Sequence, residues 1–148
     1  MMNPKELYKS TLEATEQALK IYCCWLRGNK AFGEVQTEEM PRYADADYII
    51  YFDYKFEQYV EVKTRLHWWG KFPQEKIPFR KYCFAYTVKK LWNRNTIYLL
   101  KASNKIGFLD LTEPPDRVDE LIARYDRGEE KDLYAFYSIG RFRMIHDY

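Results

Sequence analysis

The segment YVEVKTR, residues 59–65, constrains the fold more than any other stretch, because it carries two charges inside a run typical of a buried strand. Alternate residues of a strand share one face. Val60 and Val62 should therefore point into one layer, while Glu61 and Lys63 point together to the other. Charges within a sheet are costly unless they are paired or bound to something. The segment predicts a strand with one apolar face and a functional site on the other.

A second apolar run, DYIIYF, begins at Asp47, and the polar turn after it predicts an antiparallel hairpin with the first segment. The hairpin would pair Ile49 with Glu61. Asp47 would then lie opposite Lys63 on the charged face. This depends on register, because a slip of one residue would send Asp47 to the far face, and Asp45 is a rival at the same parity.

Helical and strand patterns alternate along the rest of the chain. The spacing of apolar residues predicts a long amphipathic helix over residues 4–26 with Gly28 as its stop signal. A loop with at most one short strand should follow. A second helix starts near Arg80 and turns Lys81, Phe84, Val88 and Leu91 inward; strands are expected over 96–103 and 105–111, a helix within 114–128, and a final strand or hairpin over 133–148.

This order of elements predicts an α/β (α+β) fold with a mixed central β-sheet flanked by helices. We expect one domain over residues 1–148, with 112–148 as a C-terminal helix-plus-strand extension. The three cysteines, Cys23, Cys24 and Cys83, lack metal-ligand spacing and are interpreted as reduced packing residues.

Composition excludes several classes of protein. A hydrophobic fraction of 47% and a charged fraction of 31% exclude a disordered or collagen-like chain. Since no apolar run approaches the roughly 20 residues of a membrane helix and the N-terminus lacks an apolar signal region, we expect a cytoplasmic protein with no membrane partner. The net charge of +2 is too small to indicate nucleic acid, but Glu75 is the only acid among nine basic residues between Lys71 and Lys105.

The charged face has the chemistry of a metal site. Two carboxylates held close together repel each other unless a cation lies between them, and oxygen ligands suit Mg²⁺ or Mn²⁺. Asp47 and Glu61 are the candidate ligands, and the backbone carbonyl of Val62 could add another. Lys63 beside such a metal can help to deprotonate a water and stabilise charge on a phosphate. The pattern indicates metal-assisted phosphodiester hydrolysis.

The arrangement resembles the PD-(D/E)XK nuclease superfamily over roughly residues 12–111. The motif reads Asp47 and then Glu61-Val62-Lys63, although Ala46 stands where the literal motif has proline. The resemblance implies a restriction-endonuclease-like fold and cleavage of DNA with Mg²⁺, for which Mn²⁺ can substitute. The setting it implies is a bacterial or phage-infected cell.

The resemblance also implies further site residues. Lys81 would match an extra lysine or glutamine that some members carry on the helix after the motif. An acid of the first helix often joins the site, and Glu16 or Glu13 could fill that place. For both acids a solvated helix face is an equally good reading.

Candidate DNA contacts come from cations and aromatic rings near the motif, because cations bind phosphates and rings stack on bases. These residues are Arg65, Trp68, Trp69, Arg80, Lys89 and Lys90. For Arg65, a pairing with an acid is an equally open alternative. Most aromatic residues fill cores, however. A homodimer is possible, and the alternative function is a catalytically silent nuclease-like fold that serves as a DNA-binding or protein-interaction module.

Overall fold

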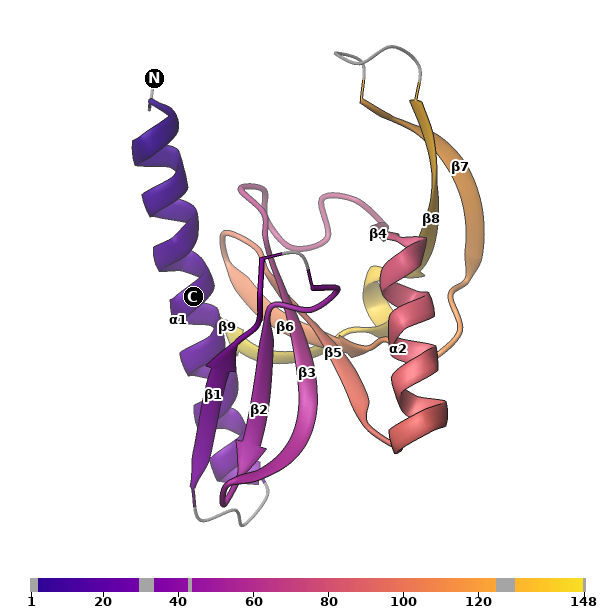
Figure 1. Cartoon of the computed structure of the whole chain (residues 1–148). Helices are drawn as coiled ribbons and strands as arrows, with labels where there is room; N and C mark the ends of the chain where they lie inside the picture. The colour runs from indigo at the N-terminus through magenta and orange to yellow at the C-terminus, as the bar shows by residue number, and fades with distance from the viewer. Residues whose placement is uncertain (1–2, 30–33, 43, 125–129, 148) are drawn as a thin grey trace.

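The computed structural model describes residues 3–29, 34–42, 44–124 and 130–147, which form two helices, nine strands and one short 3₁₀ turn (Figure 1). The first half of the chain contains α1 (Pro4–Asn29), β1 (Val35–Glu39), β2 (Tyr48–Phe52), β3 (Lys55–Thr64) and β4 (Gln74–Pro78). The second half contains α2 (Phe79–Trp92), β5 (Asn95–Lys101), β6 (Lys105–Asp110), β7 (Arg117–Arg124), β8 (Glu130–Ser138), the 3₁₀ turn (Ile139–Arg141) and β9 (Arg143–Asp147).

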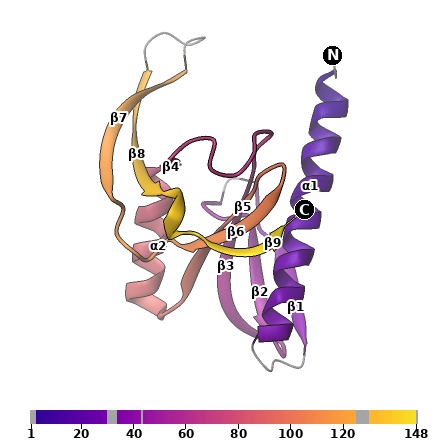
Figure 2. The same ribbon diagram turned by 180° about the vertical axis from the view of Figure 1, so that it is seen from behind.

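Six strands form a main sheet in the order β1-β2-β3-β5-β6-β9, and three form a second sheet in the order β4-β8-β7. Helix α1 covers one face of the main sheet, and α2 with the second sheet covers the other (Figures 1 and 2). β3 and β5 are parallel, whereas the other neighbours in the main sheet are antiparallel. The predicted mixed sheet flanked by helices is confirmed.

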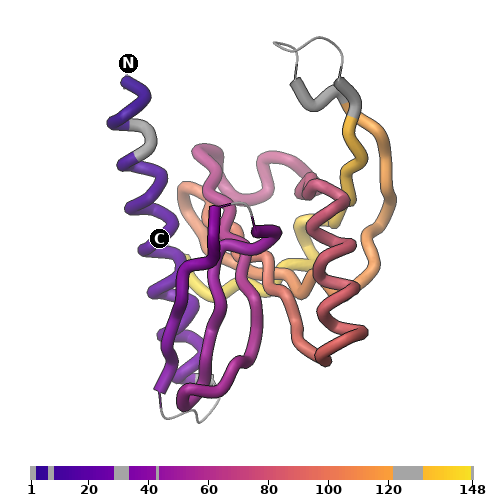
Figure 3. The backbone as a smooth tube through the Cα atoms, in the orientation of Figure 1, coloured from indigo at the N-terminus to yellow at the C-terminus, as the bar shows by residue number. Residues whose placement is uncertain are grey.

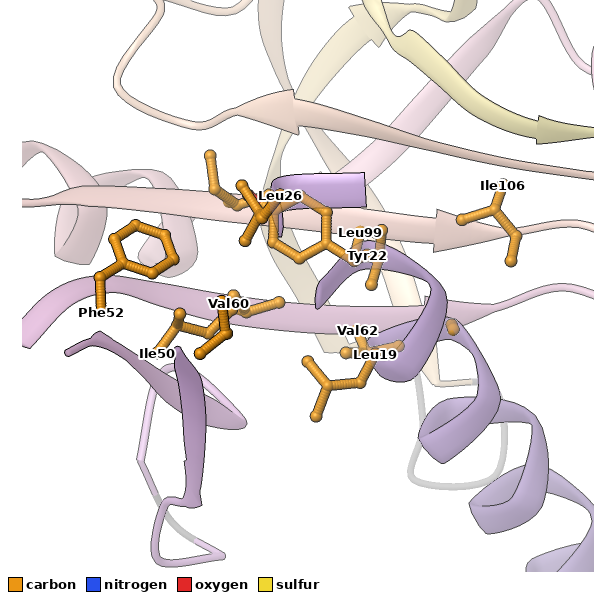
Figure 4. Packing of buried hydrophobic residues seen from close by; sticks show 12 residues of the cluster. Leu19, Tyr22, Leu26, Ile50, Phe52, Val60, Val62, Leu99 and Ile106 are labelled. Atoms are coloured by element: carbon orange, nitrogen blue, oxygen red, sulfur yellow. The ribbon is translucent and has the colours of Figure 1, made fainter. Parts of the chain in front are cut away.

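The apolar face of β3 builds the core against α1. Val60 and Val62 pack with Tyr22 and Leu26 of α1 and with Leu99 of β5 (Figure 4). Tyr22 is 1% exposed, and its hydroxyl donates a 2.6 Å hydrogen bond to Gln58, which supplies the partner that a buried phenol requires. The charged residues of β3 must consequently lie on the face toward α2.

The hairpin of β2 and β3 forms as predicted, but its register differs by two residues. Ile49 pairs with Tyr59 rather than with Glu61, and a β-bulge follows at Ile50 and Tyr51. The turn is a tight two-residue one at positions 53 and 54, both at positive φ, which fits a type I′ hairpin. A shift of two keeps the parity of every side chain, so Asp47 stays on the charged face. It lies beside Glu61 instead of opposite Lys63.

The helix predicted within residues 114–128 is wrong, because β7 occupies Arg117–Arg124 and pairs with β8. Helical spacing is present in this segment at Val118, Leu121 and Ile122. However, β4 pairs with only one edge of β8, so the other edge is open to a strand, and β7 pairs there. Tertiary pairing therefore overrides local propensity. The C-terminal extension is a hairpin followed by β9, which returns to the main sheet beside β6.

Of the other local predictions, some are confirmed and some are wrong. β1 is the short strand expected in the loop, whereas β4 was not foreseen, and α1 continues through Gly28 to Asn29. Leu91 is exposed instead of inward-facing because the buried face of α2 is formed by Ala85 and Val88. Cys24 and Cys83 are also exposed, so only Cys23 has a packing role. In the described part of the chain no helix combines the length and apolar character needed to cross a membrane.

One end of the main sheet, where β3 terminates, is bordered by the segment between β3 and β4 (Figure 3). Trp69 of this segment packs against Phe142, with ring centroids 5.6 Å apart. It also covers Gly107 of β6, where a built Cβ atom would lie 2.7 Å from the Trp69 ring and 2.9 Å from the Arg143 carbonyl. Gly107 is therefore needed for close approach and anchors this segment to the sheet.

Gly107→Ala should lower the free energy of unfolding by about 1–3 kcal/mol, because the added methyl group overpacks a contact that includes backbone. Urea unfolding followed by circular dichroism measures this. Gly140→Ala is the control: no described atom lies within 4 Å of its built Cβ, so its change should stay within about 0.5 kcal/mol. Equal stabilities of the two variants would contradict the packing role of Gly107.

Candidate active site

Asp47 and Glu61 lie side by side where β2 begins and β3 approaches its end. The Asp47 backbone N–H donates a 3.0 Å hydrogen bond to the Val60 carbonyl. The Val62 N–H donates a 2.8 Å bond to the Asp47 carboxylate. These two bonds fix the Asp47 side chain across the strand from Glu61, while Asp45, its rival in the sequence, uses its backbone carbonyl to accept a 3.4 Å bond from Lys81.

Glu61 carries a largely buried carboxylate that is bound on one oxygen only. Its Oε1 accepts from the Lys81 ammonium at 2.7 Å, and the two side chains are 13% and 12% exposed. Its Oε2 is buried without a hydrogen-bond partner among the described residues. Burial, and then the negative charge of Asp47, raise the pKa of Glu61 to about 7, although the Lys81 hydrogen bond opposes this shift.

Lys81 is on the inward face of α2, as the sequence predicted. β4 ends at Pro78, whose fixed φ suits the entry into α2. Lys81 consequently lies in the first turn of the helix, above β3. The structure therefore brings Asp47, Glu61 and Lys81 together from three elements.

Lys63 lies two residues after Glu61 on the same face of β3, and it is exposed to solvent. Partial removal of water from its ammonium group, and then the positive charge of Arg65, lower the pKa of Lys63, while Glu75 and Glu61 oppose that shift. A lysine with a lowered pKa is closer to exchanging a proton near neutral pH. Lys63 thus borders the carboxylate pair with an ammonium group whose pKa is lowered.

The donors present fit a divalent cation. Oε2 of Glu61 is buried and unpaired in the described part of the chain, and the neighbouring Asp47 carboxylate would repel it when both are ionised. The N–H and C=O of one strand residue point to the same side, so the Val62 carbonyl faces the edge where the Asp47 carboxylate lies. Mg²⁺ usually takes one or two carboxylates and keeps several waters. Two carboxylates and one carbonyl match that demand.

The acids of α1 are not part of this group. Glu16 is exposed and lines a groove with Glu39 and Tyr48 between α1 and β1. Burial raises the pKa of Tyr48, with the charges of Glu39, Asp47 and Glu16 adding to the effect. Glu13 is exposed on the outer surface of α1. Within residues 3–29, 34–42, 44–124 and 130–147 no three acidic, histidine or cysteine side chains are grouped to hold a metal.

A buried polar cluster next to the site was missed by sequence reasoning. Glu75, 5% exposed, accepts a 3.2 Å bond from Arg65 Nε and a 3.1 Å bond from the Tyr98 hydroxyl. Tyr98 is the partner of Glu61 across the β3–β5 ladder, so the cluster directly adjoins the site. The signal was present, because Glu75 is the only acid in its basic stretch and a buried acid there requires a cation. Arg65 is therefore engaged by Glu75.

The predicted DNA contacts do not all lie on one surface. Trp68 is 57% exposed, and Arg80 is exposed beside Lys81. Trp69, in contrast, packs on Gly107 and Phe142, so the prediction that it faces DNA is replaced by a packing role.

The lysines of α2 lie toward the opposite end of the sheet. Lys89 donates a 2.8 Å bond to Asn95. Asn95 begins β5 and pairs with Gln58, three residues before Glu61, while β3 and β5 run in parallel toward the site. Lys90 lies over the Tyr86 ring at 5.5 Å. The structure does not gather these two lysines with Arg65, Trp68 and Arg80.

Comparison with models of known protein families gives a match. A family model described as "Phage putative PDDEXK endonuclease" matches residues 11–142. The match contains both carboxylates and both lysines described above, and it extends past the residues that carried the resemblance in the sequence. No curated protein matches the chain.

The raised pKa of Glu61 predicts that metal binding depends on pH. Below about pH 7 a cation must displace a proton from this carboxyl, so apparent affinity should fall about tenfold per pH unit. Mn²⁺ should then raise the melting temperature more at pH 8 than at pH 6. Without metal the sign is opposite: the folded state binds more protons than the unfolded state between pH 4.5 and about 7, so the contribution of Glu61 to stability decreases as pH rises through that range.

Thermal unfolding with and without Mn²⁺ at the two pH values measures both effects. Glu61→Gln should lose most of the Mn²⁺-dependent shift. Glu57→Gln, which changes an acid four residues earlier on β3, should keep it. An identical shift at pH 6 and pH 8 in the parent would show that Glu61 is not the titrating ligand.

Proposed function

The chain belongs to the PD-(D/E)XK nuclease superfamily through the phage endonuclease family that it matches, and on that premise we propose that it is a Mg²⁺-dependent nuclease that hydrolyses phosphodiester bonds in DNA. The observation that carries the proposal is the pairing of Asp47 with a buried, half-satisfied Glu61 beside two lysines. The setting we propose is the cytoplasm of a bacterial or phage-infected cell.

Asp47 and Glu61, with the Val62 carbonyl, would hold the cation. A bound Mg²⁺, or Mn²⁺ in its place, would supply a Lewis acid that stabilises charge on the phosphate and favours ionisation of water. Asp47 is already oriented by the Val62 N–H, which leaves its carboxylate little freedom to lose on binding. Glu61 contributes the oxygen that has no partner in the described part of the chain.

Lys63 would act on the water and on the phosphate. A neutral Lys63 amine would accept a proton from the attacking water, and the lowered pKa of Lys63 favours that neutral form. The resulting ammonium stabilises the negative charge that develops as the bond from water oxygen to phosphorus forms and the bond to the leaving oxygen breaks. Lys81 would position Glu61 through the 2.7 Å ion pair, and its hydrogen bond opposes the rise in the pKa of that carboxyl, which favours the ionised form that binds a cation.

Binding of the DNA backbone would depend on cations around this site. Arg80 is exposed next to Lys81, and Lys76 is exposed on β4 directly after Glu75. Cationic side chains that contact phosphates supply affinity without reading sequence. The proposed substrate path therefore crosses the end of β3 and the start of α2.

Glu61→Gln and Lys63→Ala should both abolish divalent-dependent cleavage but fail in different ways. Removing the charge of Glu61 weakens the metal site, so activity should partly return at high Mn²⁺. Removing Lys63 leaves the carboxylates in place, so Mn²⁺ should bind as in the parent while cleavage slows at least ~100-fold. Calorimetric titration of Mn²⁺ and cleavage of linear, nicked and branched DNA measure the two properties separately.

Lys55→Ala is the matched control, because Lys55 is an exposed lysine at the other end of the same strand. It should cut DNA at the parental rate. If the parent, supplied with Mg²⁺ or Mn²⁺, cuts none of these DNAs and Mn²⁺ does not bind near Glu61, the nuclease function is excluded. The alternative function, a catalytically silent DNA-binding or protein-interaction module, then takes its place.

A further inference from the structure

A groove of about 970 Å³ begins one residue beyond Lys63. It is lined by the end of β3, the segment that joins β3 to β4, the first residues of β4, Ser103 and Phe136. The volume is at the upper end of the roughly 300–1,000 Å³ typical of ligand pockets. The groove thus adjoins the proposed site through Arg65 and Glu75, and of its lining only Lys76 has a role in the proposed nuclease function.

Exposed aromatic rings and cations alternate in this groove. Trp68 and Phe72 are 57% and 53% exposed. The Lys71 ammonium lies 5.3 Å from the Trp68 ring centroid and 5.6 Å from that of Phe72. Lys76 also lines the groove, and its ammonium lies 4.7 Å from the Tyr134 ring centroid. Because Glu75, the acid in the lining, is already paired with Arg65, the groove keeps a positive character.

The segment that carries the rings is held by contacts within the chain. The Ser103 N–H donates to the His67 carbonyl at 2.9 Å, and the Trp69 N–H donates to the Asn104 side chain at 2.7 Å. The His67 ring meets the Phe72 ring edge-on at 5.0 Å. Trp69 is packed over Gly107, so the neighbouring Trp68 is presented outward on an anchored segment. Aromatic rings fixed before binding lose little conformational entropy when they stack on a ligand.

We propose that this groove binds an unpaired, single-stranded segment of the DNA substrate, with bases stacked on Trp68 and Phe72 and phosphates held by Lys71 and Lys76. The inference rests on the proposed nuclease function for the identity of the strand. Cations alone would suit a duplex, because its phosphates lie outside. Exposed rings between the cations suit unpaired bases, whose faces are free to stack. The substrate class is therefore DNA with a single-stranded region next to the cut.

Equilibrium binding without divalent metal tests the groove separately from cleavage. The probes are a fluorescent oligothymidylate of about 12 nucleotides, within the site size of known single-strand binding domains, a blunt duplex of equal length, and an abasic strand with the same phosphates but no bases. The parent should bind oligothymidylate at least ~10-fold more tightly than either other probe, as expected when stacking adds to charge.

Trp68→Ala should weaken oligothymidylate binding about 5- to 150-fold, the range for loss of one stacked base. Trp68→Phe should retain most of the affinity, because it keeps a ring. Phe72→Ala provides a second measurement of the same groove. Trp92→Ala is the matched control: Trp92 is 58% exposed at the end of α2, away from the groove, and its loss should leave binding unchanged.

Each outcome decides the inference. Equal binding of the abasic and base-bearing strands, tighter binding of the duplex, or equal losses in Trp68→Ala and Trp92→Ala would overturn it. The nuclease proposal is judged by cleavage instead. A parent that cuts duplex DNA but ignores single strands would refute the groove alone, and one that binds single strands through Trp68 but never cuts would refute the nuclease alone.

Discussion

The alternation of side chains along β3 connects the hydrophobic core to the candidate active site. Val60 and Val62 are buried against α1, and this burial leaves Glu61 and Lys63 no face but the one toward α2. Because β3 lies between β2 and β5, its backbone is held on both edges. A strand fixed in this way cannot rotate Glu61 to solvent, so the cost of burying its carboxylate must be met locally.

The local solution is an ion pair that satisfies only half of the carboxylate. Lys81 binds Oε1 of Glu61, while Oε2 and the adjacent Asp47 carboxylate remain as two negative centres close together. Burial first, and then the negative charge of Asp47, raise the pKa of Glu61. A cation would remove the repulsion and give the unpaired oxygen a partner, so the carboxylate pair favours a metal site independently of the family match.

The second sheet places the groove next to this site. After β3 the chain leaves the main sheet. β4 then pairs with β8 in the second sheet and leads directly into α2, so one short strand positions both Glu75 and Lys81. Glu75 then binds Arg65 and Tyr98, which ties the end of β3 to β5. The carboxylate pair and the aromatic groove are therefore built on shared elements. A change in β4 would therefore affect both the carboxylate pair and the groove.

Much of the site could be predicted because it depends on local alternation and parity. The strand periodicity of residues 59–65 and the acid before DYIIYF are sufficient to put Asp47, Glu61 and Lys63 on one face, and a register error of two residues does not alter parity. The inward position of Lys81 follows equally from the helical spacing of its neighbours. These features are properties of single strands and helices.

Features that depend on which surfaces meet were decided only by the tertiary structure. Residues 117–124 have helical spacing, yet the free edge of β8 makes them a strand. Of two adjacent tryptophans, Trp69 packs against Gly107, whereas Trp68 is exposed in the groove. No local sequence pattern distinguishes the two. The sequence alone determined the chemistry of the β3 face, because a strand alternates by geometry. Only the fold decided its partners, because packing and strand pairing join residues far apart in the chain.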